Sequence, residues 1–497
     1  MKPLPHWIFL TLLSLLFSCT KKKQSQLVWD ANFPIIGSQS SPRSVDLNQD
    51  GILDFVIGAG KNEFEYSEQG IIAIDGSNGE IIWAHEAEDQ VYGSATFCDV
   101  NGDGIKDIFI GGRSPHLRAL DGRTGELIWK YNYIYQDHPV LRHARFNFNN
   151  SVLIPDQNGD GIEELLITNG GNAEAAPYET EDRFPGVLMM IDPTNGDILA
   201  ADTMPDGKET YMSPVAFSQS GSGKFQILFG TGGETISGNL YLTDVGEFVN
   251  KGLSAAKVIV QESGHGFIAP PAVADINGDG FYDIITISHA STITAINGKT
   301  LQTLWQQSVP DTECSNSFAV GYFTDDRIPD VFTFVSKGIW PENTGSIQVM
   351  INGKNGEIEY MDSIGCTGFS SPVVYDLNRD GRDEVIISIN EFDCNRYIGD
   401  QSSFAIENKL LAIDFKKRQT AIIDSTKGFK NIFSTPWIGD IDQDGYLDII
   451  HCQYYSHSDV LSFLGMRIKR IDTPVKIKKP PVWGAYMGSN GDGIFPK

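Results

Sequence analysis

Six short stretches of this chain place acidic side chains at alternating positions around a glycine, a spacing suited to holding a hard metal ion. They share the pattern D-x-[ND]-x-D-G-x-x-[DE] and begin at residues 46, 99, 156, 275, 376 and 440. Calcium takes roughly six to eight oxygen ligands, and alternating residues of a tight loop can surround it with such oxygens. The glycine at the sixth position, such as Gly104, supplies the positive φ that a sharp turn needs.

Each loop offers four side chains, at its first, third, fifth and ninth positions, and a backbone carbonyl at the seventh. In the loop that begins at Asp99 the twelfth position is Ile110 rather than glutamate, so the loop is not an EF-hand. We therefore predict up to six structural calcium ions. The predicted ligands are Asp46, Asn48, Asp50, Asp54, Asp99, Asn101, Asp103, Asp107, Asp156, Asn158, Asp160, Glu164, Asp275, Asn277, Asp279, Asp283, Asp376, Asn378, Asp380, Glu384, Asp440, Asp442, Asp444 and Asp448.

The alternative is that these acids only cap turns through the backbone. Two degenerate copies help to weigh it, one beginning at Ser218 and one at Tyr322. In the first copy serine and glutamine replace every expected ligand, while the turn glycine survives as Gly223. Loss of all the acids together, with the turn kept, is what loss of an ion would produce.

The loops belong to a larger repeat. Counting the degenerate copies, eight units start at intervals of about 47 to 64 residues along the chain, which is typical of propeller blades. Each unit carries a second motif, such as "ALDGRTGELIW" from Ala119, that predicts a strand, a tight turn and another strand. With the strands that flank the acidic loop, each unit has four antiparallel strands. The sequence thus predicts an all-β, eight-bladed propeller as a single domain over residues 27–497.

Two families share these motifs. The acidic loop followed by "DIFIGG" resembles the FG-GAP and VCBS repeats of integrin-type propellers and their bacterial relatives, and covers six units well. "ALDGRTGELIW" resembles the tryptophan motif of quinoprotein-like (PQQ-like) eight-bladed propellers and covers about five. Both resemblances imply a propeller. Neither implies a reaction, because propellers carry many unrelated functions.

The first residues are typical of an export signal. Lys2 precedes an apolar stretch over residues 7–17, too short for a permanent membrane span. The stretch ends in "LFSC", which resembles the lipobox of bacterial lipoproteins, with Cys19 as the acylated residue; an ordinary signal peptide with a chance cysteine is the alternative. We expect a signal peptide over 1–18, a lipidated cysteine and tether over 19–26, and anchoring to a membrane of the cell envelope, with the outer membrane favoured over the inner.

The net charge and the cysteine spacing exclude some classes of partner and metal site. The formal net charge of -26 argues against nucleic acid as a partner, because such partners require a basic face. No CxxC pair or zinc spacing occurs. In an exported protein we expect a disulfide between Cys366 and Cys394, with at least one other thiol left free.

The strand order places the acidic loops and the tight turns on one face and the longer, more varied connections on the other. Long loops on a rigid scaffold usually carry function, although such loops also simply collect polar residues. We expect ligand-binding residues to ring the mouth of the central channel on that second face. The candidates are His116, His138, Arg142, His143, Arg145, His265, His289 and His451. Flat surfaces for a sugar or peptide would come from Tyr133, Tyr135, Trp340, Tyr397, Tyr454 and Tyr455.

A binding module for a carbohydrate or protein ligand needs only this scaffold, its ions and a varied face. A polysaccharide lyase-like enzyme would use a histidine or arginine of that face as base or charge stabiliser, but no spacing fixes a catalytic pair. An envelope protein-assembly factor is a third possibility: the eight-bladed lipoprotein of outer-membrane protein insertion shares the export signal and tryptophan motif but lacks acidic loops. A quinoprotein dehydrogenase would be expected to have adjacent cysteines, and this chain has none.

Overall fold

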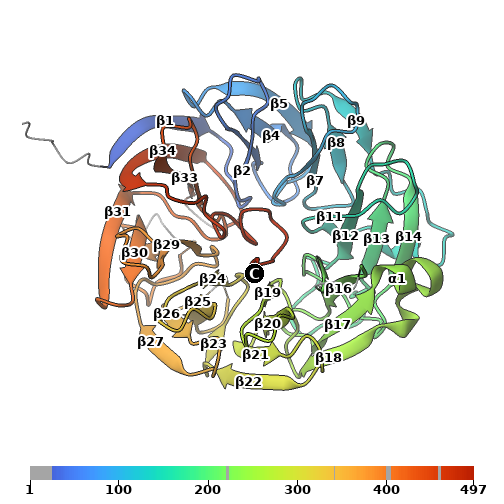
Figure 1. The fold of residues 1–497 in the computed structure, drawn as a ribbon. Coiled ribbons are helices and arrows are strands. Elements are labelled where there is room, and N and C mark those ends of the chain that lie inside the picture. The colour runs from blue at the N-terminus through green and yellow to red at the C-terminus, as the bar shows by residue number, and fades with distance from the viewer. Residues whose placement is uncertain (1–24, 220–222, 341, 399–404, 457–459) are drawn as a thin grey trace, which may run out of the picture.

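Eight antiparallel sheets stand around a central axis, as Figure 1 shows in a view along that axis. The computed structural model describes residues 25–497 except 220–222, 341, 399–404 and 457–459. This confirms the predicted eight-bladed, all-β propeller. The predicted signal peptide and Cys19 lie outside the described residues. In the described part of the chain, no helix has the length and apolar character needed to cross a membrane.

The blades are numbered in chain order, and the strands of each blade are given from the innermost outward. Blade 1 contains β2 (Arg43–Val45), β3 (Asp54–Gly58), β4 (Ser67–Ile74) and β5 (Ile81–Ala87). Blade 2 contains β6 (Thr96–Cys98), β7 (Asp107–Ile110), β8 (Arg118–Leu120) and β9 (Leu127–Lys130). Blade 3 contains β10 (Asn147–Phe148), β11 (Val152–Ile154), β12 (Glu164–Gly170), β13 (Val187–Ile191) and β14 (Ile198–Thr203), preceded by the 3₁₀ helix η1 (Leu141–His143). Blade 4 contains β15 (Val215–Ser218), β16 (Phe225–Gly230), β17 (Gly238–Asp244) and β18 (Lys257–Glu262).

The second half of the ring repeats this order. Blade 5 contains β19 (Ala272–Ala274), β20 (Asp283–Ile287), β21 (Thr292–Ile296) and β22 (Thr303–Ser308). Blade 6 contains β23 (Thr312–Glu313), β24 (Ala319–Gly321), β25 (Asp330–Lys337), β26 (Gly345–Ile351) and β27 (Ile358–Asp362). Blade 7 contains β28 (Val373–Tyr375), β29 (Glu384–Glu391), β30 (Glu407–Asp414) and β31 (Gln419–Lys427). Blade 8 contains β32 (Trp437–Gly439), β33 (Tyr446–Tyr455), β34 (Gly465–Lys476) and, as its outer strand, β1 (Gln26–Pro34).

The two ends of the chain close the ring together. β1 pairs antiparallel with β34, from Gln26 opposite Asp472 to Pro34 opposite Gly465, and the blue and red strands lie side by side in Figure 1. The strand begins at Gln26, the last residue of the predicted tether. The last unit therefore takes its fourth strand from the start of the chain.

A tryptophan on the outer strand joins each of four blades to the next. The indole Nε1–H of Trp83 donates to the carbonyl of Gly122 in the following blade at 2.9 Å. The ring also covers Gly125, where a Cβ would lie 2.6 Å from the indole and φ is +72°. The tryptophan motif is thus a connector between blades. Equivalent bonds join Trp29 to Gly76, Trp129 to Pro193 and Trp305 to Gly353.

Apolar side chains fill the space between neighbouring blades. All residues of β3 and of β7 are buried, because both faces of a central blade strand pack against adjacent blades. One expected hairpin is different. The second motif of each unit predicts a tight turn between the third and fourth strands, but in blade 4 α1 (Val245–Lys251) and η2 (Gly252–Ala255) follow β17 instead. Phe248 is 1% exposed, so the helix replaces the turn by burying an apolar residue of its own.

Hydrogen bonds link the blades around the central channel. Just before its innermost strand, most blades carry a serine, threonine or asparagine whose side-chain oxygen accepts the backbone N–H of the preceding blade. The bonds run from Thr435 to Ser41, Ser41 to Ser94, Ser94 to Asn150, Asn150 to Ser213, Ser317 to Ser371 and Ser371 to Thr435. Blade 5 has Pro270 and Pro271 at this point.

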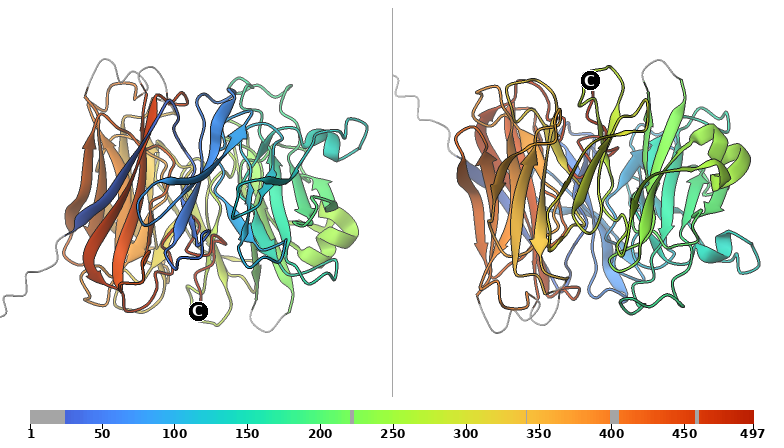
Figure 2. Two further views of the ribbon diagram at one scale, coloured as in Figure 1. Left: turned by 90° about the horizontal axis from the view of Figure 1, so that it is seen from above. Right: turned by 90° about the horizontal axis from the view of Figure 1, so that it is seen from below.

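The C-terminal tail, residues 480–497, enters the channel from the face that carries the acidic loops (Figures 1 and 2). Trp483 is 1% exposed, and its indole N–H donates to the Phe318 carbonyl at 2.8 Å. The backbone of the tail bridges Val374 at Trp483 and Val273 at Ile494. The tail therefore fills one end of the channel.

Acidic loops and the channel-mouth pocket

The acidic loop of blade 2 is organised by hydrogen bonds from its own backbone. The carboxylate of Asp99 accepts the N–H groups of Gly102 and Gly104 at 2.7 and 3.0 Å. Asn101 accepts the N–H of Asp103, and Asp103 accepts that of Ile105. Two of these bonds, from the glycine N–H to the first residue and from the seventh N–H to the fifth residue, recur in the other five intact loops, so the alternating acids do cap turns. Each capping carboxylate oxygen retains further acceptor capacity for an ion.

The ninth residue of the loop has a second role. Asp107 is fully buried, and its two carboxylate oxygens accept the N–H groups of Val100, in its own loop, and Gly122, in the turn between the third and fourth strands. This pair of bonds places both loops on one face of the propeller, as the sequence predicted. We call it the acidic-loop face. Asp54, Asp283 and Asp330 make the same pair of bonds in their blades.

Two observations, in the loops of blades 1 and 8, favour the predicted cation. Buried carboxylate oxygens, Oδ1 of Asp46 and Oδ1 of Asp440, have no hydrogen-bond partner within the described part of the chain. In blade 8 the ligand oxygens of Asp440, Asp442 and Asp444 lie within 4.8 Å of one another, the only such acidic or histidine group among the described residues. Carboxylates this close repel one another unless a positive charge is added.

Burial makes the negative charge of the ninth loop residues unfavourable. It raises the pKa of Asp54 to about 6, and the nearby Asp75 and Asp50 carboxylates add to the effect. Burial likewise raises the pKa of Asp283 to about 6 and that of Glu384 to about 7. Electrostatic neutralisation by a divalent cation in the loop would offset this cost. Among the described residues only the blade 8 loop brings three carboxylates within 4.8 Å of one another, and calcium at the six loops remains a prediction.

Blade 8 differs because it supplies a positive charge of its own. The Arg470 guanidinium is buried and lies 2.6 Å from Asp442 and 3.5 Å from both Asp448 and Asp472. In the degenerate loop of blade 6 a cation also comes from the protein. Arg382, from the next loop, donates from Nε to the Asp325 carboxylate at 2.7 Å.

The opposite face, which we call the connection face, holds a pocket at the end of the channel. Each innermost strand runs from this face toward the acidic loops, so the residues just before these strands surround the channel mouth. The cavity, of about 240 Å³, is termed the mouth pocket. It is lined by Gln39, Ser41, Tyr92, Ser94, Arg113, Asn149, Asn150, Tyr211, Ser213, Glu234, Ile268, Ser315, Trp340, Phe369, Phe433, Leu461 and Tyr486. Tyr486 belongs to the C-terminal tail, which therefore contributes to this pocket.

Charged side chains around the mouth form close pairs. Arg113 lies 2.6 Å from Glu63, and its guanidinium carbon lies 4.9 Å from the ring centre of Tyr92. Arg183 lies 2.5 Å from the buried Glu209, whose carboxylate also accepts the hydroxyl of Tyr211 at 3.2 Å. These pairs fix the side chains in position.

His289 and Glu313 lie next to the pocket. His289 is 1% exposed and its Nε2 is 3.7 Å from Glu313 Oε2. Its Nδ1 lies 3.1 Å from the carbonyl of Cys314 and 3.3 Å from the hydroxyl of Ser315, a residue of the pocket wall. The backbone N–H of Trp340 donates to Glu313 at 2.7 Å, so this pair supports the pocket from behind.

The predicted ring of basic residues does not line the mouth pocket. His451 is fully buried in the middle of β33, and His289 is buried behind the wall. His138 instead accepts the N–H groups of Val140 and Leu141 at the start of η1. The physical reason is that the repeat assigns residues to a face without showing which side chains point inward. His116, Arg142, His143, Arg145 and His265 are also absent from the pocket lining.

The predicted aromatic surfaces are divided among several sites. Trp340 lines the mouth pocket, and Tyr397 lines a separate hollow beside it. Tyr454 is 1% exposed and packs on Phe463, so it offers no surface. Tyr133 and Tyr135 pack partly buried around η1 in the cluster between blades 2 and 3.

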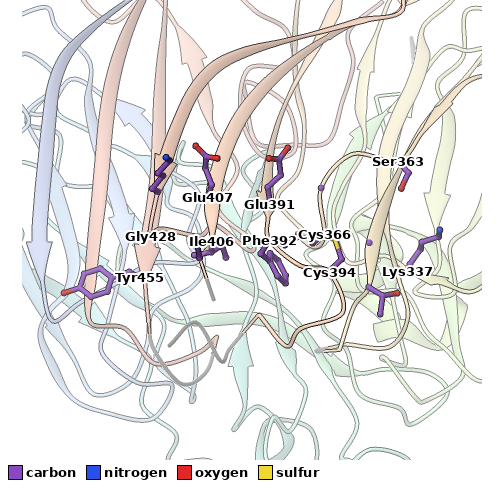
Figure 3. A pocket seen from close by; sticks show the side chains of 15 residues that line it. Lys337, Ser363, Cys366, Glu391, Phe392, Cys394, Ile406, Glu407, Gly428 and Tyr455 are labelled. Carbon is purple, nitrogen blue, oxygen red and sulfur yellow. Dashed lines mark hydrogen bonds between the residues drawn. A yellow bond between two sulfur atoms is a disulfide. The ribbon is translucent and has the colours of Figure 1, made fainter. Parts of the chain in front are cut away.

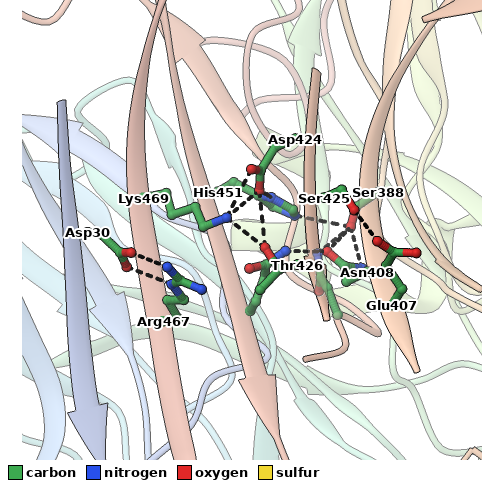
Figure 4. A network of polar contacts seen from close by, with 12 residues as sticks. Asp30, Ser388, Glu407, Asn408, Asp424, Ser425, Thr426, His451, Arg467 and Lys469 are labelled. Atoms are coloured by element: carbon green, nitrogen blue, oxygen red, sulfur yellow. Dashed lines mark hydrogen bonds and ion pairs between the residues drawn. The ribbon is translucent and has the colours of Figure 1, made fainter. Parts of the chain in front are cut away.

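His451 belongs to a buried polar network between blades 7 and 8, drawn in Figure 4. Its Nε2 lies 3.2 Å from the hydroxyl of Ser388, and its Nδ1 lies 3.9 Å from Asp424. Lys469 donates to Asp424 at 2.7 Å and to Thr426 at 2.6 Å. This histidine therefore has a structural role.

A larger hollow, of about 910 Å³, lies between blades 6, 7 and 8 (Figure 3). Its wall includes Lys337, Glu391, Glu407 and Tyr455. The disulfide between Cys366 and Cys394 also borders it, which confirms the predicted pairing. The described thiols Cys98, Cys314 and Cys452 are free.

Most residues of the mouth pocket were missed by sequence reasoning. Glu234 and Arg113 are single residues in loops that differ from unit to unit, and Tyr486 lies outside the repeats. One signal was available: a serine, threonine or asparagine recurs shortly before the first strand of most units, as in Ser94 and Thr435.

Comparisons with known proteins agree with this architecture. No family model matches the chain. In an alignment of 212 residues the chain is 26% identical to integrin alpha-5 of Xenopus laevis, and the match covers 39% of this chain but only 18% of that protein. Among solved structures, quinohemoprotein alcohol dehydrogenase from Comamonas testosteroni matches with a TM-score of 0.52 and 12% identity, over 92% of this chain and 78% of that one. A europium-containing methanol dehydrogenase matches with a TM-score of 0.52 and 10% identity, over 90% and 93%. Likenesses of this size concern the propeller fold alone.

Proposed function

We propose that the protein is a calcium-stabilised binding module of the cell envelope that takes a carbohydrate or protein ligand at the mouth pocket. The acidic loops serve stability on one face, and recognition occurs on the other. Cys19 carries the lipid that holds the module to a membrane, with the outer membrane favoured. The grouped loop carboxylates and the "LFSC" sequence support these two parts of the proposal.

The mouth pocket is the observation that carries the binding function. Its wall combines aromatic side chains, among them Trp340 and Phe433, with the polar Asn149 and Glu234. Ligand pockets typically combine such apolar walls with a few placed polar groups, in volumes of roughly 300–1,000 Å³. At about 240 Å³ this one suits a single sugar ring or amino-acid side chain inserted from a larger ligand.

A glycan and peptide array probed with calcium-loaded protein tests this function. Trp340→Ala removes the largest aromatic group of the wall and should abolish binding of any captured ligand. Tyr322→Ala is the control, since Tyr322 is 37% exposed and begins the degenerate loop of blade 6 on the opposite face. Equal binding by both variants would show that the ligand uses another surface.

A carbohydrate-active enzyme is the second candidate, and His289 is the observation that favours it. Its Nδ1 lies within 3.3 Å of the Ser315 hydroxyl at the pocket wall, and Glu313 lies on its other side. A histidine so placed can transfer protons. Release of shortened products from a captured glycan, if lost in His289→Gln, would establish catalysis. Binding without product release would support the binding module instead.

A further inference from the structure

One carboxylate of the mouth pocket stands apart from the ion pairs around it. The basic side chains Arg113 and Arg183 are paired with Glu63 and Glu209. His289 faces Glu313. The side chain of Glu234 lines the pocket, yet it makes no hydrogen bond or ion pair within the described part of the chain. The negative charge of Glu234 therefore lacks a direct partner.

The surroundings of Glu234 make a solvated, inert carboxylate a poor explanation. Its side chain is open to solvent within the mouth pocket, whose wall it shares with aromatic side chains. Burial of the site raises the pKa of Glu234; the His289 charge opposes this effect and Glu313 adds to it. A carboxylate held in a recess is stabilised when an opposite charge comes close. The two arginines at the mouth and His289 each already have an acidic partner. The remaining neighbour, His265, directs its Nδ1 to the backbone carbonyl of Glu234 at 2.5 Å rather than to the carboxylate.

We infer that the mouth pocket binds a cationic group of its ligand, an ammonium carried by an amino sugar or a lysine side chain, with Glu234 as its counter-ion. This rests on the proposed function and names the chemistry of the inserted group. Six aromatic side chains line the same cavity, namely Tyr92, Tyr211, Trp340, Phe369, Phe433 and Tyr486. Aromatic walls with a carboxylate are a known way to recognise ammonium groups.

The nearby arginine does not oppose this assignment. Arg113 is neutralised by Glu63 at 2.6 Å and lies over the Tyr92 ring. It thus shows that an aromatic ring of this wall already accepts one cation. The formal charge of -26 also attracts cationic ligands from a distance and increases their rate of encounter.

The experiment compares pairs of probes that differ only in charge. Titration calorimetry with the full-length mature protein measures binding of a glucosamine tetrasaccharide and its fully N-acetylated counterpart, and of a lysine tetrapeptide and its Nε-acetylated counterpart. At least one amine probe should bind at least about tenfold more tightly than its acetylated form, and raised salt should weaken it. The two arms show whether the amine comes from a sugar or a peptide.

Glu234→Gln keeps the shape of the side chain and removes its charge, and should abolish the preference for the amine. Glu247→Gln is the control, because Glu247 is a partly exposed acid on α1 that pairs with Lys251, away from the channel. Equal affinity for charged and acetylated probes, with binding lost in Trp340→Ala, would overturn the inference and leave the proposed function standing. An amine preference that persists in Glu234→Gln would also overturn it. Absence of binding by any of the four probes would count against both.

Discussion

At the scale of single residues, the acidic motif combines two tasks that its pattern alone does not separate. The first, third and fifth side chains cap the loop and are predicted ligands of an ion, whereas the ninth, in four blades, also connects two loops. Blade 3 shows what happens when the connection is missing. Pro193, which has no N–H group, occupies the turn position where Gly122 donates in blade 2. The ninth residue of blade 3, Glu164, accepts the N–H groups of Gln157 and Asn158 in its own loop and none from the turn among the described contacts.

Asp107→Ala separates these tasks. It leaves the buried N–H groups of Val100 and Gly122 without their acceptor, and we expect the free energy of unfolding to fall by about 2–4 kcal/mol. Urea denaturation in EDTA is the measurement, because the loss should persist without metal. Asp103→Ala is the control, and it should cost less in EDTA because Asp103 caps an exposed turn. A loss for Asp107→Ala only in calcium would mean that the residue acts solely as a ligand.

The contacts of Asp424 predict that the free energy of unfolding depends on pH. Burial alone would raise its pKa, but the His451 and Lys469 side chains outweigh burial and lower it. The stabilisation is therefore complete above the usual aspartate pKa of about 4 and is lost as pH falls through the lowered value. Asp424→Asn leaves Lys469 buried without its carboxylate, and should cost about 3 kcal/mol at pH 7.

The pH dependence is measured by urea unfolding at several values between pH 7 and pH 3. The difference between wild type and Asp424→Asn should shrink toward the acid end. A constant difference would show that the charge of Asp424 contributes nothing.

At the scale of elements, strands and blades follow from the sequence because the motifs have one position per unit. Strand β7 and the turn at Gly122 are found where the repeat places them. The position of a side chain across a blade is different. His451 was expected at the channel mouth and lies in a packed interface, because a long central strand such as β33 extends the buried region beyond the motif.

Trp83→Phe tests the connector between blades. Phenylalanine keeps most of the packing over Gly125 but leaves the Gly122 carbonyl without the indole donor, so unfolding should become easier by about 1–2 kcal/mol. Thermal or urea unfolding measures the change. Trp340→Phe is the control, since no interblade bond from the Trp340 indole is present among the described contacts; similar losses in both variants would exclude a specific role for the hydrogen bond.

At the scale of the whole molecule, the two faces have different constructions. The acidic-loop face is repetitive and closed by the tail around Trp483, whereas the connection face is irregular and open at the mouth pocket. The repeat explains the first face from sequence. The tail and the mouth pocket could not be predicted, because neither the tail nor single loop residues such as Glu234 recur.

Removal of calcium should act on the molecule as a whole. With the loops emptied, repulsion among carboxylates such as Asp54 and Asp50 is no longer offset. We expect a lower melting temperature in EDTA and recovery when calcium, but not sodium, is restored. An unchanged melt, with no calcium found by elemental analysis of purified protein, would contradict the calcium prediction.

The pairing of β1 with β34 also determines the order in which the strands can assemble. β1 is synthesised first, yet its partner is a strand more than 400 residues later in the chain. Contacts so distant in sequence form slowly, and a strand edge without its partner can associate with other chains. The earliest segment of the propeller is therefore the last to find its place, so its edge must be protected from other chains until the final blade has formed.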